Sequence, residues 1–261
     1  MTAMVQADGV GRRFGGLEVL EGIDFGLDEG EVLSVIGPSG CGKSTLLGLI
    51  AGLDRPTTGT ITVGGGTASD DRLARCAYMP QEDCLLPWFS ALDNAALALR
   101  NQGRGRKVAR EEAFPVFERL GLGGFEDAKP AELSGGMRQR VAFARTWLAG
   151  KSVLLLDEPL ASLDGLTRRS MQAWLAPLLA GGERSAVLVT HDLDEALYLG
   201  DRVLVLSGRP GRVLGVREAP GRGEMEPVEA SGTRAFTQAR NELASLLESA
   251  SPEDQIGGPR S

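Results

Sequence analysis

Short apolar runs alternate with segments of helical periodicity along most of the chain. Helical spacing is clear at Lys43–Gly52 and Gly165–Ala180, whereas Asp201–Ser207 and Gly211–Val216 flank a turn and predict a hairpin. Strands that alternate with helices are typical of an α/β fold with a mostly parallel sheet. The apolar runs predict buried strands at Glu31–Gly37, Thr58–Val63, Cys76–Gln81, Lys151–Pro159 and Arg184–Thr190.

The apolar positions take helical spacing between residues 90 and 122. Ser90, with Asp93 three residues later, resembles a capping box and predicts that a helix begins there. Pro115 lies inside a second helical pattern and is expected to kink that helix or shift its start. We therefore predict that residues 85–150 form a helical subdomain inserted into the strand-and-helix scaffold.

The end of the chain has a different composition. Residues 218–233 are rich in Gly, Pro and Glu, which predicts a linker, and Phe236–Ser249 has the pattern of an amphipathic helix. We therefore place one main domain at residues 1–217. Residues 218–261 are assigned to a linker and a C-terminal helix.

The charge and cysteine content argue against several classes of protein. Lys and Arg number 28 against 35 Asp and Glu, which gives a net charge of −7. This balance argues against a general nucleic-acid surface, which needs a basic stripe. The three cysteines show no CxxC spacing and predict neither a disulfide framework nor a zinc site. They favour the reducing cytosol.

Hydrophobic residues make up 42% of the chain, which predicts a globular protein with a sizeable core. The first residues, MTAMVQADGVGRRF, lack the apolar stretch of a secretory signal. No apolar run approaches the roughly 18 residues of a membrane span. We expect a chain that is soluble by itself and reaches a membrane only through a partner.

A glycine-rich octet, GPSGCGKS, fits the phosphate-binding pattern G-x-x-x-x-G-K-[ST]. It follows a predicted strand and precedes a predicted helix, a context that makes a chance match a weak alternative. We expect backbone N–H groups to wrap the β- and γ-phosphates, Lys43 to place its charge between them, and Ser44 to hold Mg²⁺. The predicted phosphate-binding residues are Gly37, Pro38, Ser39, Gly40, Cys41, Gly42, Lys43, Ser44 and Thr45.

Two carboxylates end the apolar run VLLLDEP. Asp157, at the carboxyl end of the predicted strand, is placed to bind Mg²⁺ through water. Glu158 points elsewhere and is a candidate to take a proton from the attacking water. Taken alone, the pair fits an ordinary strand that ends in acidic loop residues equally well. The phosphate-binding loop upstream favours the catalytic interpretation.

Two further polar residues follow predicted strands. His191, the single histidine, lies at the carboxyl edge of the sheet, where a neutral imidazole could bond the γ-phosphate and orient the water. A lone histidine is more often structural. The amide of Gln81 could touch Mg²⁺ or the attacking water, or simply be polar surface. Asp192 and Glu195 are expected to cap the following helix.

The octet LSGGMRQR provides a second anion cradle, because a Ser-Gly-Gly turn before a helix points N–H groups and a hydroxyl at an anion. Ser134, Gly135 and Gly136 are its predicted binding residues. Two cradles for one nucleotide make sense if each of two copies supplies half of two shared sites. That arrangement predicts an ATP-driven clamp between two copies of the chain.

Two aromatic positions leave alternatives open. Phe14, in RRFGG, could stack on an adenine ring or pack in the core. The cluster LLPWF at Leu85–Phe89 is either local core or an apolar contact surface for a partner.

Together these motifs resemble the ATP-binding cassette (ABC) ATPases, over roughly Val5 to Val216 and in the family's order. The resemblance implies a P-loop NTPase fold with a mostly parallel core sheet, an antiparallel β region and an inserted helical subdomain. It assigns Phe14 to the adenine-stacking aromatic, Gly37–Ser44 to Walker A, Gln81 to the Q-loop, Leu133–Gly136 to the signature, Asp157 to Walker B, Glu158 to the catalytic glutamate, Ser162–Asp164 to the D-loop and His191 to the switch histidine.

The resemblance also implies a head-to-tail homodimer with two ATP molecules between the subunits. Ser134 and Gly136 of one copy would face the γ-phosphate held by Lys43 of the other, and Asp164 would contribute to the nucleotide site. The implied Mg²⁺ ligands are Ser44, Gln81 and Asp157. The chain departs from the commonest signature at Met137, where the family usually has Gln.

A narrower likeness rests on YMPQEDCLLPW, LSGGMRQRVAFAR, HDLDEAL and LSGRPGRV, which look like the nitrate, sulfonate and taurine importer ATPases. Those proteins are separate cytoplasmic subunits that dock on the inner face of the membrane under a pair of permease subunits. An external solute-binding protein delivers the substrate. By that likeness Gln81–Phe89 would meet the permease, with Trp88 as its aromatic anchor.

The sequence therefore predicts an ATP-hydrolysing subunit of an ABC importer with no nucleic-acid partner. The alternative is a soluble ABC-type ATPase that acts on DNA or the ribosome, although such relatives usually carry coiled-coil insertions or two fused cassettes. A small-molecule P-loop kinase would leave LSGG and His191 unexplained.

Overall fold

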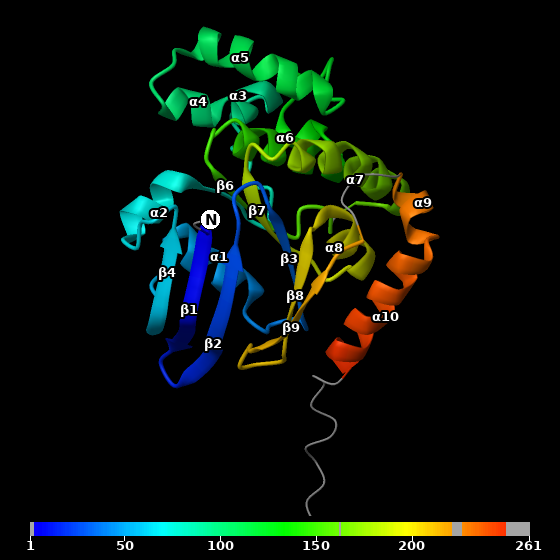
Figure 1. The fold of residues 1–261 in the computed structure, drawn as a ribbon. Helices are drawn as coiled ribbons and strands as arrows, with labels where there is room; N and C mark the ends of the chain where they lie inside the picture. The colour runs from blue at the N-terminus through cyan, green and yellow to red at the C-terminus, as the bar shows by residue number, and fades with distance from the viewer. Residues whose placement is uncertain (1–2, 162, 221–225, 249–261) are drawn as a thin grey trace, which may run out of the picture.

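The computed structural model describes residues 3–161, 163–220 and 226–248. Its strands form a six-stranded sheet and a three-stranded sheet (Figure 1). The strands are β1 Val5–Phe14, β2 Leu17–Leu27, β3 Val32–Ile36, β4 Thr58–Val63, β5 Cys76–Met79, β6 Val153–Asp157, β7 Ser185–Val189, β8 Arg202–Leu206 and β9 Val213–Glu218. The helices are α1 Lys43–Ala51, α2 Ser69–Arg75, α3 Ala91–Ala95, α4 Leu97–Asn101, α5 Arg106–Arg119, a 3-10 turn at Pro130–Glu132, α6 Gly135–Trp147, α7 Gly165–Ala180, α8 Leu193–Leu199, α9 Pro227–Ser231 and α10 Arg234–Glu248.

The large sheet has the order β5-β6-β7-β3-β8-β9, and its first five strands are parallel. β9 pairs antiparallel with β8 at one edge. Strands β3, β6 and β7 are buried along their whole length, as near-continuous apolar runs predict for a sheet covered on both faces. The carboxyl ends of β5, β6 and β7 therefore lie side by side at one edge of the molecule.

The small sheet is antiparallel, with β1 between β2 and β4. Helix α1 lies between it and the large sheet, and its side chains Leu46, Leu47 and Ile50 are fully buried in their shared core. A second core on the other face of the large sheet joins α3, α5, α6, α7, α8 and α10.

Helices α3, α4 and α5 stand apart from both sheets at the top of Figure 1, with α6 beneath them. At the right of Figure 1, α10 packs on α8 and β9, and buries Phe236 and Leu243. No helix among the described residues is both long enough and apolar enough to cross a bilayer.

The predicted strands of the large sheet, its β8–β9 hairpin and the helix at Gly165–Ala180 are confirmed. Ser90 caps α3 by accepting a hydrogen bond from the Asp93 N–H, as its motif predicts. Pro115 lies inside α5, which begins at Arg106, so the predicted shift of that start is wrong.

The linker predicted at residues 218–233 is wrong in part. Glu218 ends β9, and Pro227–Ser231 forms α9, whose Ala230 is buried. Pro227 is at the first helical turn, where its missing N–H costs nothing, so a proline-containing segment can form a helix there. The C-terminal helix predicted at Phe236–Ser249 is confirmed as α10, Arg234–Glu248, and residues 249–261 lie outside the described residues.

Candidate functional site

The phosphate-binding loop connects β3 to α1. Gly40 and Gly42 have φ of 75° and 106°, a region that favours glycine. A Cβ on Gly37 would lie 2.9 Å from the Cys41 Sγ and 3.0 Å from the Leu206 carbonyl oxygen. The loop therefore needs its glycines both for its turns and for its close approach to β8.

Lys43 is the first residue of α1, and its side chain turns back over the loop. Its Nζ donates hydrogen bonds to the carbonyl oxygens of Gly37 at 2.7 Å and Pro38 at 3.0 Å. Only 7% of the residue is exposed. The loop thus holds an ammonium group at the N-terminus of a helix, where the helix dipole adds to the attraction for phosphate.

Asp157 ends β6 beside Ser44 of the loop. Burial raises the pKa of its carboxyl group, and hydrogen bonds from Ser44 and Tyr78 oppose that shift. The Tyr78 hydroxyl donates to Oδ2 at 3.1 Å, and Oδ1 is a buried oxygen without a hydrogen-bond partner within the described residues. A carboxylate oxygen left unpaired next to a serine hydroxyl fits the oxygen ligands that Mg²⁺ prefers.

The three predicted catalytic side chains meet at the carboxyl edge of the sheet. Gln81 Nε2 donates to Glu158 Oε2 at 3.3 Å, and His191 Nδ1 lies 3.3 Å from the same oxygen. Glu158 has φ of 48°, which is strained for a residue with a side chain, and its N–H is held by the Val189 carbonyl at 2.9 Å. The Asp157 side chain contacts Tyr78, whereas the Glu158 side chain contacts Gln81 and His191.

A cavity of about 380 Å³ lies in front of the loop and brings these parts together. Gln81 and Glu158 face the loop residues across it, so a group bound by the loop would lie next to the carboxylate. Arg209, from the turn after β8, also lines it and is absent from the sequence-based site. The lining residues are Val19, Ser39, Gly40, Gly42, Lys43, Ser44, Thr45, Gln81, Glu158 and Arg209.

Phe14 ends β1 with 46% of its surface exposed, which rules out the core-packing alternative. The Arg12 guanidinium lies over one face of its ring, 4.2 Å from the centroid, and forms an ion pair with Asp54 at 2.8 Å. Adenine stacking stays a prediction, and an exposed ring backed by a fixed cation is compatible with it.

The signature segment lies at the start of α6, away from this cavity. Ser134 is exposed and caps the helix by accepting a hydrogen bond from the Met137 N–H at 3.2 Å. Gly136 packs against the segment before α7, since a Cβ there would lie 3.0 Å from Leu163 Cδ2. Neither Ser134 nor Gly136 lines the cavity that holds Lys43.

The D-loop prediction falls on Ser162, which lies outside the described residues, and on Asp164. The Asp164 side chain caps α7 by accepting hydrogen bonds from the N–H groups of Leu166 and Thr167, each at 3.1 Å. In the single chain Asp164 is therefore a helix cap, and its contact with nucleotide remains a prediction.

Comparison with known proteins agrees with this geometry. The ABC transporter family model matches residues 20–161. The chain belongs to the ABC transporter family.

Curated ABC relatives match most of the chain. It is 49% identical over 199 residues to the aliphatic sulfonates import ATP-binding protein SsuB 1 of Rhodococcus jostii, covering 76% of this chain and 77% of that protein. It is 44% identical to the formylaminopyrimidine import ATP-binding protein ThiZ of Halalkalibacterium halodurans, covering 74% of each. It is 42% identical to the taurine import ATP-binding protein TauB of Burkholderia pseudomallei, covering 77% of each.

A solved ABC cassette is also similar. The dimeric post-hydrolysis structure of the ATP-binding cassette MJ0796, bound to ADP and Pi, matches with a TM-score of 0.75 and 30% identity, over 84% of this chain and all of that one. The family and this neighbour show that the present chain is an ATP-binding, ATP-hydrolysing cassette with the ABC ATPase fold.

Side chains of α6 hold the Q-loop of this ABC ATPase, a connection that the sequence analysis missed. Arg145 donates to the carbonyl oxygens of Asp83 at 2.8 Å and Cys84 at 2.7 Å, and Arg138 Nε donates to the Asp83 carboxylate at 2.8 Å. Residues 138 and 145 are seven apart and so share one face of the helix. The helix that begins at the signature is thereby fixed to the loop that carries Gln81.

The prediction that the Glu195 side chain caps α8 is wrong, whereas the prediction for Asp192 is confirmed. Asp192 caps the helix by accepting from the N–H groups of Asp194 and Glu195, but the Glu195 side chain is buried and accepts from the Thr190 hydroxyl at 3.1 Å. Burial and the charge of Asp192 raise the pKa of Glu195 to about 8.

This raised pKa predicts a pH-dependent stability. The folded protein keeps the Glu195 proton where the unfolded chain loses it, so the stabilising contribution is complete below about pH 4.5 and is lost as the pH rises to about 8. Glu195→Gln keeps an acceptor for Thr190 without a charge. The melting temperature of Glu195→Gln minus that of wild type is expected to increase by at least about 5 °C from pH 5 to pH 8.

Differential scanning calorimetry of both proteins at the two pH values measures this gain. Glu229→Gln, at an exposed position on α9, is the matched control and should follow wild type at both. A Glu195→Gln protein that keeps a constant difference from wild type across the range would show that Glu195 titrates at its ordinary pKa.

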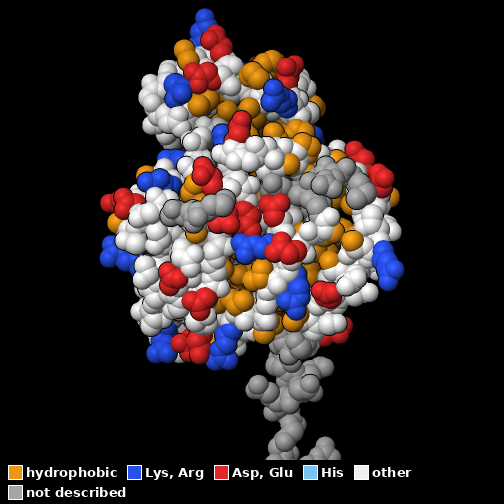
Figure 2. Space-filling model, in the orientation of Figure 1, with side chains coloured by type: hydrophobic (Ala, Val, Ile, Leu, Met, Phe, Trp, Pro, Cys, Tyr) orange, Lys and Arg blue, Asp and Glu red, His pale blue; other side chains and the backbone are white. Residues whose placement is uncertain are grey.

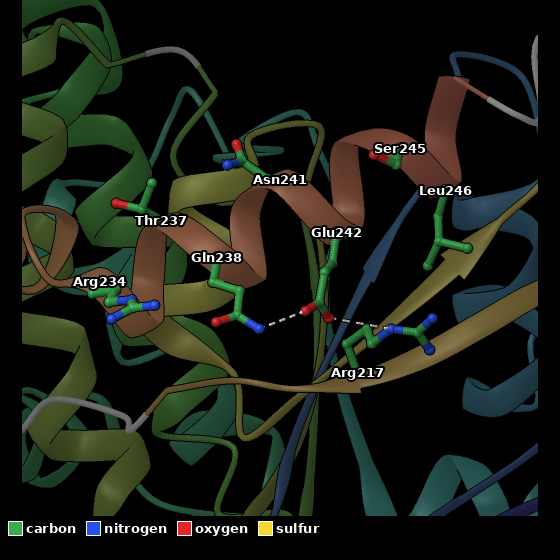
Figure 3. A pocket seen from close by; sticks show the side chains of 8 residues that line it. All are labelled: Arg217, Arg234, Thr237, Gln238, Asn241, Glu242, Ser245 and Leu246. Carbon is green, nitrogen blue, oxygen red and sulfur yellow. Dashed lines mark hydrogen bonds and ion pairs between the residues drawn. The ribbon is translucent and has the colours of Figure 1, made fainter.

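A larger cavity lies elsewhere, between α10 and β9 (Figure 3). It has a volume of about 840 Å³, and Glu242 in its lining accepts from Gln238 at 3.1 Å and lies 3.7 Å from Arg217. None of the predicted site residues lines it, so size alone does not identify the catalytic site of this cassette.

Proposed function

We propose that this ABC ATPase is the energy-supplying subunit of an importer, and that two copies close around two Mg-ATP molecules to drive a pair of permease subunits. Glu158 and Gln81 line the cavity of the phosphate-binding loop, and His191 Nδ1 lies 3.3 Å from Glu158 Oε2; this arrangement carries the proposal. The cavity thus combines a binding loop for the triphosphate with a carboxylate that can take a proton from the attacking water.

The chain's own groups divide the work of hydrolysis. Lys43 and the loop amides bind the β- and γ-phosphates, and Glu158 accepts the proton of the water whose oxygen attacks the γ-phosphorus. The bond between that phosphorus and the bridging oxygen breaks, and ADP leaves with the electron pair. Gln81 and His191 hold the Glu158 carboxylate in position through its Oε2. Mg²⁺, held by Ser44, Asp157 and Gln81, would neutralise phosphate charge.

We propose that the signature residues of a second copy complete each nucleotide site. Ser134 is exposed at the N-terminus of α6, where N–H groups and the helix dipole favour an anion. Within one chain it does not line the Lys43 cavity, so only a second copy would bring it to the γ-phosphate. The similar MJ0796 cassette is dimeric, which supports the same arrangement.

The permease is proposed to dock on residues 81–89. Trp88 is 66% exposed, and its ring meets Phe89 edge-on with centroids 6.4 Å apart. Lys129 Nζ bonds the Trp88 carbonyl oxygen at 3.0 Å, which fixes the backbone beneath the ring. An exposed aromatic on a fixed backbone suits a hot spot that inserts between helices of a membrane partner.

Trp88→Ala is expected to weaken association with the permease by at least about tenfold, since it removes a large contact area from a fixed anchor. ATP hydrolysis by the isolated subunit should stay within about twofold of wild type. Leu53→Ala removes a side chain of 61% exposure after α1 and serves as the control. The measurement is recovery of permease subunits with the tagged ATPase from detergent-solubilised membranes. Equal recovery with both variants would place the docking surface elsewhere.

For the solute we propose a small sulfonate, because sulfonate and taurine import proteins are among the similar relatives. The test isolates the membrane complex through this subunit and titrates its external binding protein calorimetrically with taurine, alkanesulfonates, nitrate and formylaminopyrimidine. Binding of a sulfonate alone is the expected result. Tight binding of formylaminopyrimidine or nitrate would assign a different solute.

This proposal places the ATPase in the cytoplasm, on the inner face of the membrane under its permease. The alternative of a DNA- or ribosome-directed ATPase is not favoured, since the similar curated relatives are import proteins. On the face shown in Figure 2, acidic and basic side chains are intermixed without a basic stripe, which agrees with the net charge of −7.

A further inference from the structure

The turn between β8 and β9 reaches across to the phosphate-binding loop (Figure 1). Its Gly211 N–H donates to the Val19 carbonyl at 2.8 Å, and its carbonyl accepts from the Glu21 N–H at 3.0 Å. A Cβ on Gly211 would lie 2.4 Å from the Cys41 carbonyl oxygen, so only glycine permits this approach. The turn is therefore fixed between β2 and the loop.

Arg209 extends from this turn onto the loop itself. Its Nε and Nη2 donate to the Gly40 carbonyl oxygen at 3.0 and 2.8 Å. A Cβ on Gly40 would lie 3.0 Å from Nη2, so this glycine leaves room for the guanidinium. Because a guanidinium has five N–H donors, two bonds to one carbonyl leave three donors for another acceptor.

Arg209 lies where its charge could contact a bound nucleotide. Arg209 lines the same cavity as Lys43, Ser39 and Glu158. Among the described residues no carboxylate lies within ion-pair distance of its guanidinium. The Arg209 charge also acts on the loop residue Cys41. Burial raises the pKa of the Cys41 thiol, and the charges of Lys43 and Arg209 oppose that shift.

We propose that Arg209 is a further nucleotide-binding residue, whose guanidinium is fixed on the Gly40 carbonyl and supplies a second protein cation to the polyphosphate. The inference rests on the proposed function, because it requires the nucleotide to occupy this cavity. A cation without a carboxylate partner at the rim of a phosphate site gains its counter-charge when the anion binds. Without nucleotide, the Arg209 guanidinium is already held by the Gly40 carbonyl, so little side-chain entropy is lost when nucleotide binds.

The test measures binding of a fluorescent ATP analogue in the presence of Mg²⁺ at low and physiological salt. Arg209→Gln keeps an amide donor for the Gly40 carbonyl but removes the charge. We expect it to raise the Kd about tenfold at low salt, as the loss of one charge-assisted contact does. The difference from wild type should shrink at higher salt, because the lost interaction is electrostatic. Arg209→Lys should recover part of the affinity.

Arg212→Gln is the matched control. Arg212 lies on the same turn and pairs with Glu21 at 2.6 Å, but it does not line the cavity. Arg209→Gln with the Kd and salt dependence of wild type would overturn the inference and leave Arg209 as a support of the loop alone. If wild type itself bound no ATP analogue, the proposed nucleotide site would fail as well. Normal binding by wild type with loss in Lys43→Ala separates the two outcomes.

Discussion

Glu158→Gln is expected to lower steady-state ATP hydrolysis by about 10²–10³-fold while ATP binding is kept, because general-base catalysis contributes factors of this size. The amide is nearly isosteric with the carboxylate and still accepts from Gln81, whose Nε2 lies 3.3 Å from Oε2. What it loses is the ability to take the proton from the attacking water. The loss should therefore appear in kcat and hardly in KM.

A phosphate-release assay under saturating Mg-ATP measures the rate. The control is Glu111→Gln on the exposed face of α5, where Glu111 lies 4.0 Å from Lys107. That variant should hydrolyse ATP as wild type does. Full turnover by Glu158→Gln would remove Glu158 as the general base.

Lys43→Ala is expected to weaken ATP binding by at least about 100-fold, because it removes a largely buried charge from the loop proposed to bind the phosphates. Its Nζ is held by the carbonyls of Gly37 and Pro38, so the ammonium is already in place before nucleotide arrives. The same change leaves those two carbonyls without their donor, and a small drop in melting temperature should accompany the loss of affinity.

Isothermal titration with Mg-ATP gives the affinity, and circular dichroism checks that the variant is folded. Lys151→Ala is the matched control, since Lys151 also donates to a carbonyl, that of Ala74 at 2.8 Å, but far from the cavity along the sheet. Its affinity should equal that of wild type. A folded Lys43→Ala protein with unchanged affinity would contradict the assignment of the phosphate site.

The parts of the site that could be predicted from the sequence follow strands of the parallel sheet. Gln81, Glu158 and His191 come after β5, β6 and β7, which are neighbours in the sheet order. Because carboxyl ends of parallel strands meet at one edge, local patterns sufficed to bring these residues together. The glycine loop was equally predictable, since its spacing G-x-x-x-x-G-K-[ST] is typical of phosphate-binding loops.

Other parts of the fold and of the site depend on long-range packing, which no local sequence pattern predicts. Strands β1 and β2 were missed because glycines and register shifts interrupt their alternation, as at Ala7–Val10. The role of Arg209 depends on how an antiparallel hairpin packs against β2 and the loop, 169 residues away in the chain. Glu195 looked like a cap because its sequence position fits one, whereas the short helix α8 turns its side chain inward to Thr190.

The central claim is that ATP is buried between two copies of this cassette, each of which supplies one half of two sites. The most direct measurement is the mass of the Glu158→Gln protein by light scattering, with and without ATP. The account predicts about twice the 27.5 kDa of one chain with ATP, one chain's mass without it, and no dimer for Ser134→Arg. A Glu158→Gln protein that binds one ATP per chain and stays monomeric would contradict it.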